Sequence, residues 1–304
     1  MRWQPGERRP RPHARGTRRP PRLGGCAVTT TEIVEDLPDT EYHADRRSLS
    51  YSGAKLLLPP STPAKFRWAM DNPRPPKREY DFGHVAHTLV LGTGSDIVVV
   101  DAPDWRTKVA KEQRAAAYEA DQVPILKREF ASALAMETAL REHPIAGALF
   151  AEGRAEVSVY ADDPATGVRR RARPDWLTHL RSGRLAIVDY KTTDNANPAA
   201  FTRSVSSYRY DMQCDWYTDV CEAVGLGDNP AFLFVAQEKE PPYAVSVNEL
   251  TADDVRIAHR LNRFAIDLYA RCTETNTWPG WDSINLIELS RWAAYEREDI
   301  LTHG

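Results

Sequence analysis

The 304-residue sequence predicts an α/β fold in which a mixed central β-sheet is flanked by helices, with a helical elaboration ahead of the sheet. Three observations support this class. After about residue 150, short runs rich in apolar and β-branched residues alternate with longer amphipathic stretches, as strands do with helices. Two of these runs are separated only by turn residues, as in a β-hairpin. The preceding part shows mainly helical periodicity.

The individual elements follow from periodicity and from the Pro, Gly and capping residues that bound each run. Ahead of the sheet, helices are expected at residues 50–58, 63–70, 79–91 and 125–141. Strands are expected at residues 156–160, 168–177, 185–190, 231–235 and 244–247. Further helices are expected at residues 198–206, 210–223 and 252–271, with a terminal helix at 284–298.

Two acidic motifs lie in the predicted hairpin. An R-P-D motif ends at Asp175, and a D-Y-K motif runs from Asp189 to Lys191. A hairpin folded about residues 182–183 places Asp175 opposite Asp189, and the Cβ atoms of such neighbours are about 5 Å apart. Because strand side chains alternate between faces, Lys191 projects with Asp189 whereas Tyr190 points away. The sequence therefore predicts two carboxylates and an amine in one place.

This grouping is typical of metal-assisted phosphodiester hydrolysis. Two carboxylates this close repel each other unless a proton or a cation lies between them, and hard oxygen ligands suit Mg²⁺ or Mn²⁺ better than zinc. Such an ion polarises a phosphoryl oxygen and lowers the pKa of a bound water, while a neighbouring ammonium positions that water. An isolated D-x-K motif, however, is more often a solvated hairpin with an ordinary ion pair.

Other polar residues occur at helical spacings around the hairpin. His87 follows Gly83 by one turn, and Gln213 shares a helical face with Tyr217. An imidazole can bind metal, and an amide and a phenol can hydrogen-bond phosphate. Each has a structural alternative, with His87 as a hydrogen-bonded core histidine and Tyr217 as a packed aromatic residue.

Taken in chain order, these motifs resemble the RecB-type branch of the PD-(D/E)-x-K nuclease superfamily. The order is G-x-x-x-H, an acidic strand containing Glu156, R-P-D, D-Y-K and Q-x-x-x-Y. Segments at residues 105–111, 187–193, 197–201 and 235–243 are similar to the exodeoxyribonuclease VIII family, the RecE-like recombination exonucleases of phages and prophages. The resemblance covers about residues 42–281 and implies a restriction-endonuclease-like fold. Where the superfamily often has Glu, this chain has Asp189, a shorter carboxylate that still ligates metal.

The resemblance implies an Mg²⁺-dependent exonuclease, with Mn²⁺ able to substitute, that acts on double-stranded DNA ends. It would digest the 5′-terminated strand and leave a 3′ single-stranded tail for a single-strand annealing protein. The ring assemblies of the family imply a homo-oligomer. Two alternatives stay open: another nuclease on the same fold, such as an endonuclease or a repair exonuclease, and a DNA-binding scaffold that has lost catalysis.

The resemblance also implies roles for individual residues. The groups that would bind the metal are the side chains of His87, Asp175 and Asp189 and the carbonyl of Tyr190. Lys191 would act with the two aspartates on the attacking water. Glu156 would support the metal or the water, or else be a surface residue at a strand edge. Gln213 and Tyr217 would steady the DNA backbone.

Basic residues suggest a path for DNA across an acidic body. Residues 1–28 contain eight arginines and one acid, a charge of +7 that leaves −10 on the remainder. This proline-containing arm is predicted to be disordered and to contact phosphate, or else to lie upstream of the true start codon. Alternation along residues 168–177 predicts that Arg171 and Arg173 face the acids, and Lys108 lies on a probable helix. Solvated faces are the alternative for these charges.

Length and composition favour one elaborated domain with terminal appendages. The expected parts are a disordered basic arm at 1–28, a PD-(D/E)-x-K exonuclease domain at 29–282 and a C-terminal helical tail at 283–304. No apolar run approaches the about 20 residues that cross a bilayer, and no signal peptide is evident, so we expect a cytoplasmic protein without a membrane role. The four cysteines lack metal-ligand spacing and are expected to be reduced thiols.

Overall fold

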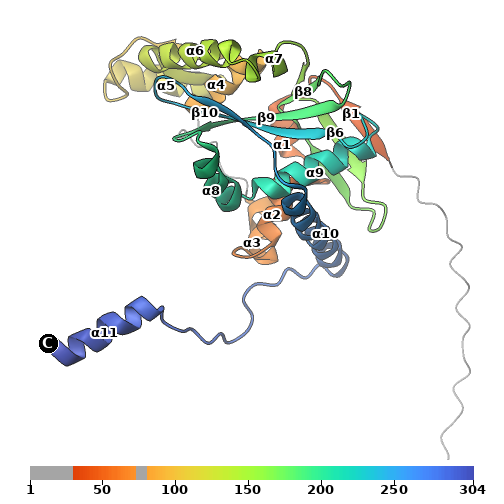
Figure 1. The fold of residues 1–304 in the computed structure, drawn as a ribbon, viewed down its shortest axis with the longest axis vertical. Coiled ribbons are helices and arrows are strands. Elements are labelled where there is room, and N and C mark those ends of the chain that lie inside the picture. Colours follow the sequence, from red (N-terminus) through yellow and green to blue (C-terminus); the bar gives the residue numbers. More distant parts are fainter. Residues whose placement is uncertain (1–29, 73–80) are drawn as a thin grey trace, which may run out of the picture.

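The computed structural model describes residues 30–72 and 81–304, which form three β-sheets and the helices around them (Figure 1). The predicted basic arm lies outside the described residues. The largest sheet has five strands in the order β11-β10-β9-β8-β5. These are β5 (Arg154–Ala155), β8 (Trp176–His179), β9 (Leu185–Thr193), β10 (Ala231–Glu238) and β11 (Val245–Asn248).

The strands of the two smaller sheets all precede β8 in the chain. A four-stranded sheet has the order β1-β6-β7-β2, and β3 pairs with β4. Their strands are β1 (Thr31–Val34), β2 (Leu49–Ser50), β3 (Ile97–Val100), β4 (Val123–Leu126), β6 (Ser158–Asp162) and β7 (Arg169–Ala172).

Helices lie on both faces of the five-stranded sheet (Figure 1). On one side are α4 (Asp81–Leu91), α6 (Lys127–Glu142) and α7 (Ala146–Leu149), with α5 (Lys108–Glu119) beside them. On the other side are α2 (Tyr51–Leu57), α3 (Pro63–Asp71), α8 (Pro198–Tyr208), α9 (Tyr210–Ala223) and α10 (Ala252–Thr275). The short α1 (Asp39–Ala44) precedes β2, and α11 (Arg291–His303) ends the chain.

Alternation along β9 separates two hydrophobic cores and fixes the direction of its polar side chains. Val188 and Tyr190 pack with residues of α4 and α6, whereas Ile187 packs with residues of α9 and α10. Because successive strand residues point to opposite faces, Asp189 and Lys191 share the α9 side with Ile187.

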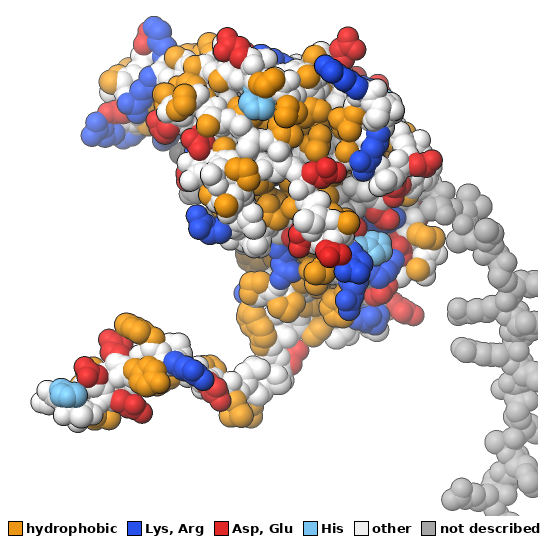
Figure 2. All heavy atoms as spheres, viewed as in Figure 1, with side chains coloured by type: hydrophobic (Ala, Val, Ile, Leu, Met, Phe, Trp, Pro, Cys, Tyr) orange, Lys and Arg blue, Asp and Glu red, His pale blue; other side chains and the backbone are white. Residues whose placement is uncertain are grey.

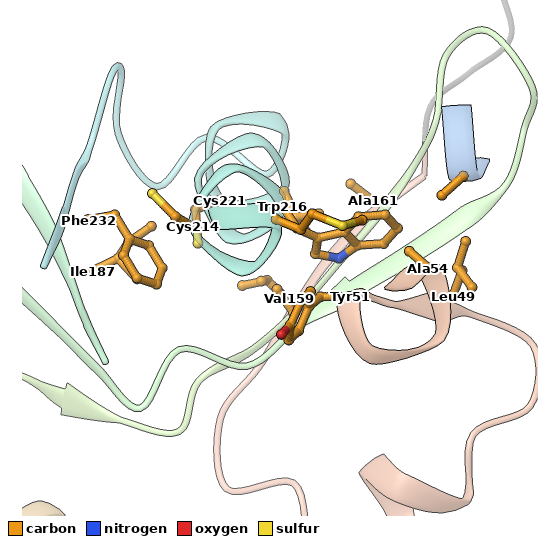
Figure 3. Close-up of a cluster of buried hydrophobic side chains, with 14 of the residues drawn as sticks. Leu49, Tyr51, Ala54, Val159, Ala161, Ile187, Cys214, Trp216, Cys221 and Phe232 are labelled. Carbon is orange, nitrogen blue, oxygen red and sulfur yellow. The ribbon is translucent and has the colours of Figure 1, made fainter. Parts of the chain in front are cut away.

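Trp216 on α9 joins the two larger sheets through the second of these cores. Its ring is fully buried in the cluster that contains Tyr51, Ala54 and Val159 (Figure 3), and its Nε1 donates a hydrogen bond to the Arg171 carbonyl at 2.9 Å. Truncating a core tryptophan to alanine costs about 3–5 kcal/mol. Helix α9 is therefore packed against both of the larger sheets.

The predicted mixed sheet with flanking helices is confirmed. β9 and β10 pair in parallel, whereas β8 with β9 and β10 with β11 are antiparallel. The helix predicted at 210–223 has those bounds, and the helix predicted at 50–58 is α2 with Ser50 as its N-cap.

Four predicted elements are corrected. The strand at 168–177 is divided into β7 and β8, which belong to different sheets, because Pro174 has no N–H to continue a ladder. The strand at 156–160 begins at Ser158, since Glu156 has a φ of 48°. The helix at 125–141 starts two residues later, because Ile125 and Leu126 complete β4.

The terminal helix also begins later than predicted, at Arg291, where the Ser290 side chain accepts a hydrogen bond from Ala293 N–H. This helix has no buried residue and extends away from the body, with hydrophobic side chains exposed on it (Figures 1 and 2). No described helix is long and apolar enough to span a membrane.

Candidate active site

The β8–β9 hairpin brings the two predicted aspartates together. Trp176 pairs with Val188 in its ladder, so the next position places Asp175 opposite Asp189. The backbone N–H of Tyr190 donates to Asp175 Oδ2 at 2.9 Å, which fixes that carboxylate at the start of β8. The predicted turn at residues 182–183 and the resulting register are therefore confirmed.

A second, kinked hairpin brings Glu156 to the same carboxylates. The antiparallel register of β5 with β8 continues unchanged in β6 with β7, although the two pairs belong to different sheets. Glu156 and Asp175 lie opposite each other at the break, where Glu156 N–H donates to the Asp175 carbonyl at 3.0 Å. Burial, followed by the charges of Asp39 and Asp175, raises the pKa of Glu156 to about 7. Three acidic residues thus occupy adjacent chain segments.

Asp189 and Lys191 form a buried ion pair on the α9 side of the sheet. Asp189 is 1% exposed, and its Oδ2 lies 2.5 Å from Lys191 Nζ. Its Oδ1 accepts a hydrogen bond from Gln213 Nε2 at 2.6 Å. Burial raises the pKa of Asp189 to about 7 against the lowering effect of the ammonium, whereas Asp189 and Asp175 keep the pKa of Lys191 above its usual value despite burial. Lys191 is therefore a cation at neutral pH.

His87 lies on the other side of this strand and contacts its backbone. Its Nε2–H donates to the Tyr190 carbonyl at 2.8 Å, and its Nδ1 lies 3.8 Å from Asp175 Oδ2. Burial lowers the pKa of His87, and the Asp175 charge opposes that effect. The predicted G-x-x-x-H helix is α4, which brings His87, Tyr190 and Asp175 together as expected.

These groups lie within a chain segment that matches a known family. The family model described as "PDDEXK-like domain of unknown function (DUF3799)" matches residues 68–289. The chain belongs to this PDDEXK-like family. The predicted membership of the PD-(D/E)-x-K superfamily and the restriction-endonuclease-like fold class are thereby confirmed, and the assignment supports a nuclease, a class that generally uses divalent metal ions.

One solved structure has a similar fold. The crystal structure of a "Putative exonuclease" from Eubacterium rectale matches with a TM-score of 0.57 and 13% identity, covering 89% of this chain and 100% of that chain. The crystal structure of SSO0001 matches with a TM-score of 0.35 and 13% identity, covering 75% of this chain and 81% of that chain. No curated protein matches the sequence.

The donor set of this PDDEXK-like site suits a divalent cation. Asp175 and Asp189 supply hard carboxylate oxygens on neighbouring strands, and the buried Asp189 Oδ2 has no hydrogen-bond donor of good geometry, only the charge of the Lys191 ammonium. His87 and the Tyr190 carbonyl are directed at each other. Within residues 30–72 and 81–304, no three His, Cys, Asp or Glu side chains are already arranged around a common metal position. The residues fit the ion by chemistry, and binding would redirect contacts that they now make with each other.

Gln213 and Tyr217 share one face of α9, where Gln213 is buried and Tyr217 is partly buried. Gln213 is buried and orients Asp189, and the ring of Tyr217 packs edge-on against Phe232. Burial raises the pKa of Tyr217 well above its usual value, and the charges of Asp189 and Asp175 act in the same direction. Gln213 therefore holds Asp189 from α9, and the expected contacts of Gln213 and Tyr217 with the DNA backbone stay predictions.

Two arginines of the predicted basic path, Arg171 and Arg173, lie in the interior and do not face the acids. Arg171 is buried against Asp45 and Ser48, and Arg173 is buried against Asp39. Both guanidinium groups also lie over the ring of Tyr42. The expectation that they face phosphate assumed one continuous strand, and the break at residue 174 removes that assumption.

Lys108 lies at the start of α5, where its side chain is 88% exposed and pairs with Glu112. That helix packs on β3 and β4, the two-stranded sheet, rather than on the strands that bear the acids. The structure therefore does not bring Lys108 into the acidic centre.

Two residues near Lys191 were not anticipated from the sequence. The ring centroid of Tyr210 lies 5.0 Å from Lys191 Nζ, and burial, followed by the charges of Lys191 and Arg209, lowers the pKa of Lys55 on α2. Tyr210 had a local signal, as it begins the predicted helix that carries Gln213. Lys55 had none, because its proximity depends on packing between α2 and distant parts of the chain.

Proposed function

We propose that this PDDEXK-like protein is an Mg²⁺-dependent 5′-to-3′ exodeoxyribonuclease that digests one strand of linear double-stranded DNA and leaves 3′ single-stranded tails for recombination. The supporting observation is that adjacent strands hold Asp175 opposite Asp189, with Lys191 on the same face as Asp189. The polarity and the role in recombination come from the resemblance of the D-Y-K segment to the exodeoxyribonuclease VIII family. The protein from Eubacterium rectale that has a similar fold is named a "Putative exonuclease", which agrees with an exonuclease activity.

In this proposal, His87, Asp175, Asp189 and the Tyr190 carbonyl hold the metal. A bound divalent ion polarises a phosphoryl oxygen and lowers the pKa of a water. Lys191, which contacts Asp189 as an ammonium, would donate a hydrogen bond and balance negative charge.

The surrounding residues keep these groups in place. Gln213 holds Asp189 through its Oδ1, and Tyr190 N–H holds Asp175. Glu156, which lies opposite Asp175, would support the attacking water.

The organisation of the chain is part of the proposal. Residues 29–282 form the nuclease domain, and residues 283–304 form a C-terminal tail. The proposed assembly is a homo-oligomeric ring in the cytoplasm, the substrate is a double-stranded DNA end, and a single-strand annealing protein is the expected partner.

Digestion of end-labelled DNA distinguishes this proposal from another nuclease activity. Linear duplexes labelled at either 5′ or 3′ end are incubated with Mg²⁺ beside a covalently closed circle. We expect release of 5′-terminal nucleotides first, with the circle intact. Cleavage of the closed circle would replace the exonuclease with an endonuclease, and release from 3′ ends would reverse the polarity.

Titration with metal and with DNA distinguishes the nuclease from a DNA-binding scaffold that has lost catalysis. Binding of linear duplex without hydrolysis, in either Mg²⁺ or Mn²⁺, would favour a protein that has lost catalysis. His87→Ala is expected to raise the Mg²⁺ concentration needed for half-maximal activity more than it weakens DNA binding. An unchanged Mg²⁺ dependence would return His87 to a purely structural role.

A further inference from the structure

A second lysine is fixed beside the catalytic ammonium by backbone and tyrosine contacts. Lys55 Nζ on α2 donates to the Tyr208 carbonyl at 3.1 Å and to the Tyr51 hydroxyl at 3.3 Å. The same hydroxyl donates to the Tyr208 carbonyl at 2.8 Å. This triangle ties α2 to the end of α8, so the ammonium is held at a defined position.

The turn between α8 and α9 adds a second cation. Arg209 is the only residue between the two helices and adopts a left-handed conformation with a φ of 56°. Its Nη2 donates to the Pro59 carbonyl at 2.9 Å. Burial, then the charges of Lys191 and Arg209, lower the pKa of Lys55, so the three basic groups share one electrostatic environment.

These cations are not fully neutralised by the protein. Lys191 pairs with Asp189, but neither Lys55 nor Arg209 has a carboxylate within ion-pair distance among the residues that the structure describes. The charges of Asp189 and Asp211 act on Tyr51, and that of Asp175 acts on Tyr210, but none of these carboxylates pairs with Lys55 or Arg209. Clustered cations with few counter-charges attract an anion.

An aromatic surface lies next to the cations. The ring of Tyr208 is stacked on that of Tyr210, with centroids 5.4 Å apart and planes 25° apart, and Tyr208 is 56% exposed. Tyr210 in turn lies over Lys191. An exposed ring beside basic side chains is the combination that binds a nucleotide, with its base stacked and its phosphate paired.

We propose that Lys55 and Arg209 bind a phosphate group of the DNA strand next to the scissile position, and that Tyr208 stacks against a base of that strand. This subsite rests on the proposed nuclease function for its substrate. Lysine supplies a point charge, and the arginine fork can pair with two phosphate oxygens. Because Lys55 neighbours Lys191, a phosphate held there would place the next stretch of strand at the acidic centre.

The test measures binding without cleavage. The full chain is titrated with a fluorescent oligonucleotide duplex bearing a single-stranded end, in EDTA, at several salt concentrations. Lys55→Ala is expected to weaken binding about tenfold and to reduce the slope of log K against log salt by about 0.7 to 0.9, the loss of one phosphate contact. Lys55→Arg should restore the slope. Lys127→Ala, an exposed lysine on α6 across the sheet, is the matched control and should leave both values unchanged.

Tyrosine variants test the stacking surface separately. Tyr208→Ala should weaken binding about tenfold with an unchanged salt slope, and Tyr208→Phe should bind like wild type, because stacking needs the ring and the Lys55 contact uses the backbone carbonyl. Duplexes with a 5′-phosphate or a 5′-hydroxyl identify the phosphate. A loss confined to the 5′-phosphorylated duplex indicates a terminal phosphate, and an equal loss on both indicates the backbone.

The outcomes distinguish this subsite from the nuclease proposal. Wild-type affinity and slope in Lys55→Ala would overturn the subsite even if the protein cleaves DNA. If Lys55→Ala binds DNA more weakly but the wild-type protein does not cleave DNA with any metal, the subsite is supported and the proposed nuclease activity is refuted.

Discussion

The Asp189–Lys191 pair predicts a strong energetic coupling that a double-mutant cycle can measure. Asp189 is 1% exposed and the Lys191 side chain is 20% exposed, so removing either side chain leaves the other as a poorly solvated polar group without its partner. Breaking a buried pair typically costs 3–5 kcal/mol. Lys191 also contacts the Tyr210 ring and is partly solvated, so we expect Asp189→Asn to lower the free energy of unfolding by about 3 kcal/mol, the lower end of this range. Lys191→Met is expected to have a similar effect.

The double variant should lose much less than the sum. With both charges gone, no group is left unpaired, and the expected total is about 3 kcal/mol, a coupling of about 3 kcal/mol. Urea unfolding in EDTA at fixed pH gives the four free energies of unfolding. All three variants should be inactive, including the double variant. Free energies that simply add, within about 0.5 kcal/mol, would refute the reasoning that these two side chains are paired in the interior.

Three further outcomes follow from other parts of the molecule. Arg173→Ala should lower the free energy of unfolding by about 3 kcal/mol, because the contacts that the buried guanidinium makes with Asp39 and Ser158 are lost. Lys108→Ala, at an exposed position, should change it by less than about 0.5 kcal/mol. Equal effects of the two variants in urea unfolding would contradict this prediction. Burial raises the pKa of Asp163, but hydrogen bonds from Arg263 and Thr166 outweigh burial and lower it. The stabilisation that ionised Asp163 gives the folded state is therefore complete above about pH 4 and is lost as the pH falls through the lowered folded-state pKa. Asp163→Asn should make the free energy of unfolding less dependent on pH in this acid range, and an unchanged dependence would show that Asp163 does not stabilise the fold in this way. Deletion of residues 283–304 should leave the melting temperature within about 2 °C, since α11 buries no residue, and should reduce self-association in light scattering; a large drop in melting temperature would show that the segment packs on the body.

The acidic hairpin was predictable because its information is local. The turn lies midway between Asp175 and Asp189, so their register follows from counting residues, and alternation then assigns Lys191 to the same face as Asp189. The helices that bring His87 and Gln213 to this hairpin had clear periodicity, and the family resemblance indicated that they belong together.

The remaining features depend on contacts between distant segments. Arg171 and Arg173 look like a basic strand, but their partners Asp45 and Asp39 lie more than 120 residues earlier in the chain. No local sequence pattern indicates contacts between residues so far apart in the chain. In the same way, the contact of Lys55 with the Tyr208 carbonyl spans 153 residues.

The most direct test of the account is the rate of nucleotide release from linear duplex DNA in Mg²⁺, measured for wild type and for Asp175→Asn, Asp189→Asn and Lys191→Met, each shown to be folded by circular dichroism. We predict measurable release by wild type and a loss of at least about 100-fold in each variant. A wild-type rate in any of the three, or no hydrolysis by the wild-type protein in Mg²⁺ or Mn²⁺, would contradict the claim that this hairpin is a hydrolytic centre.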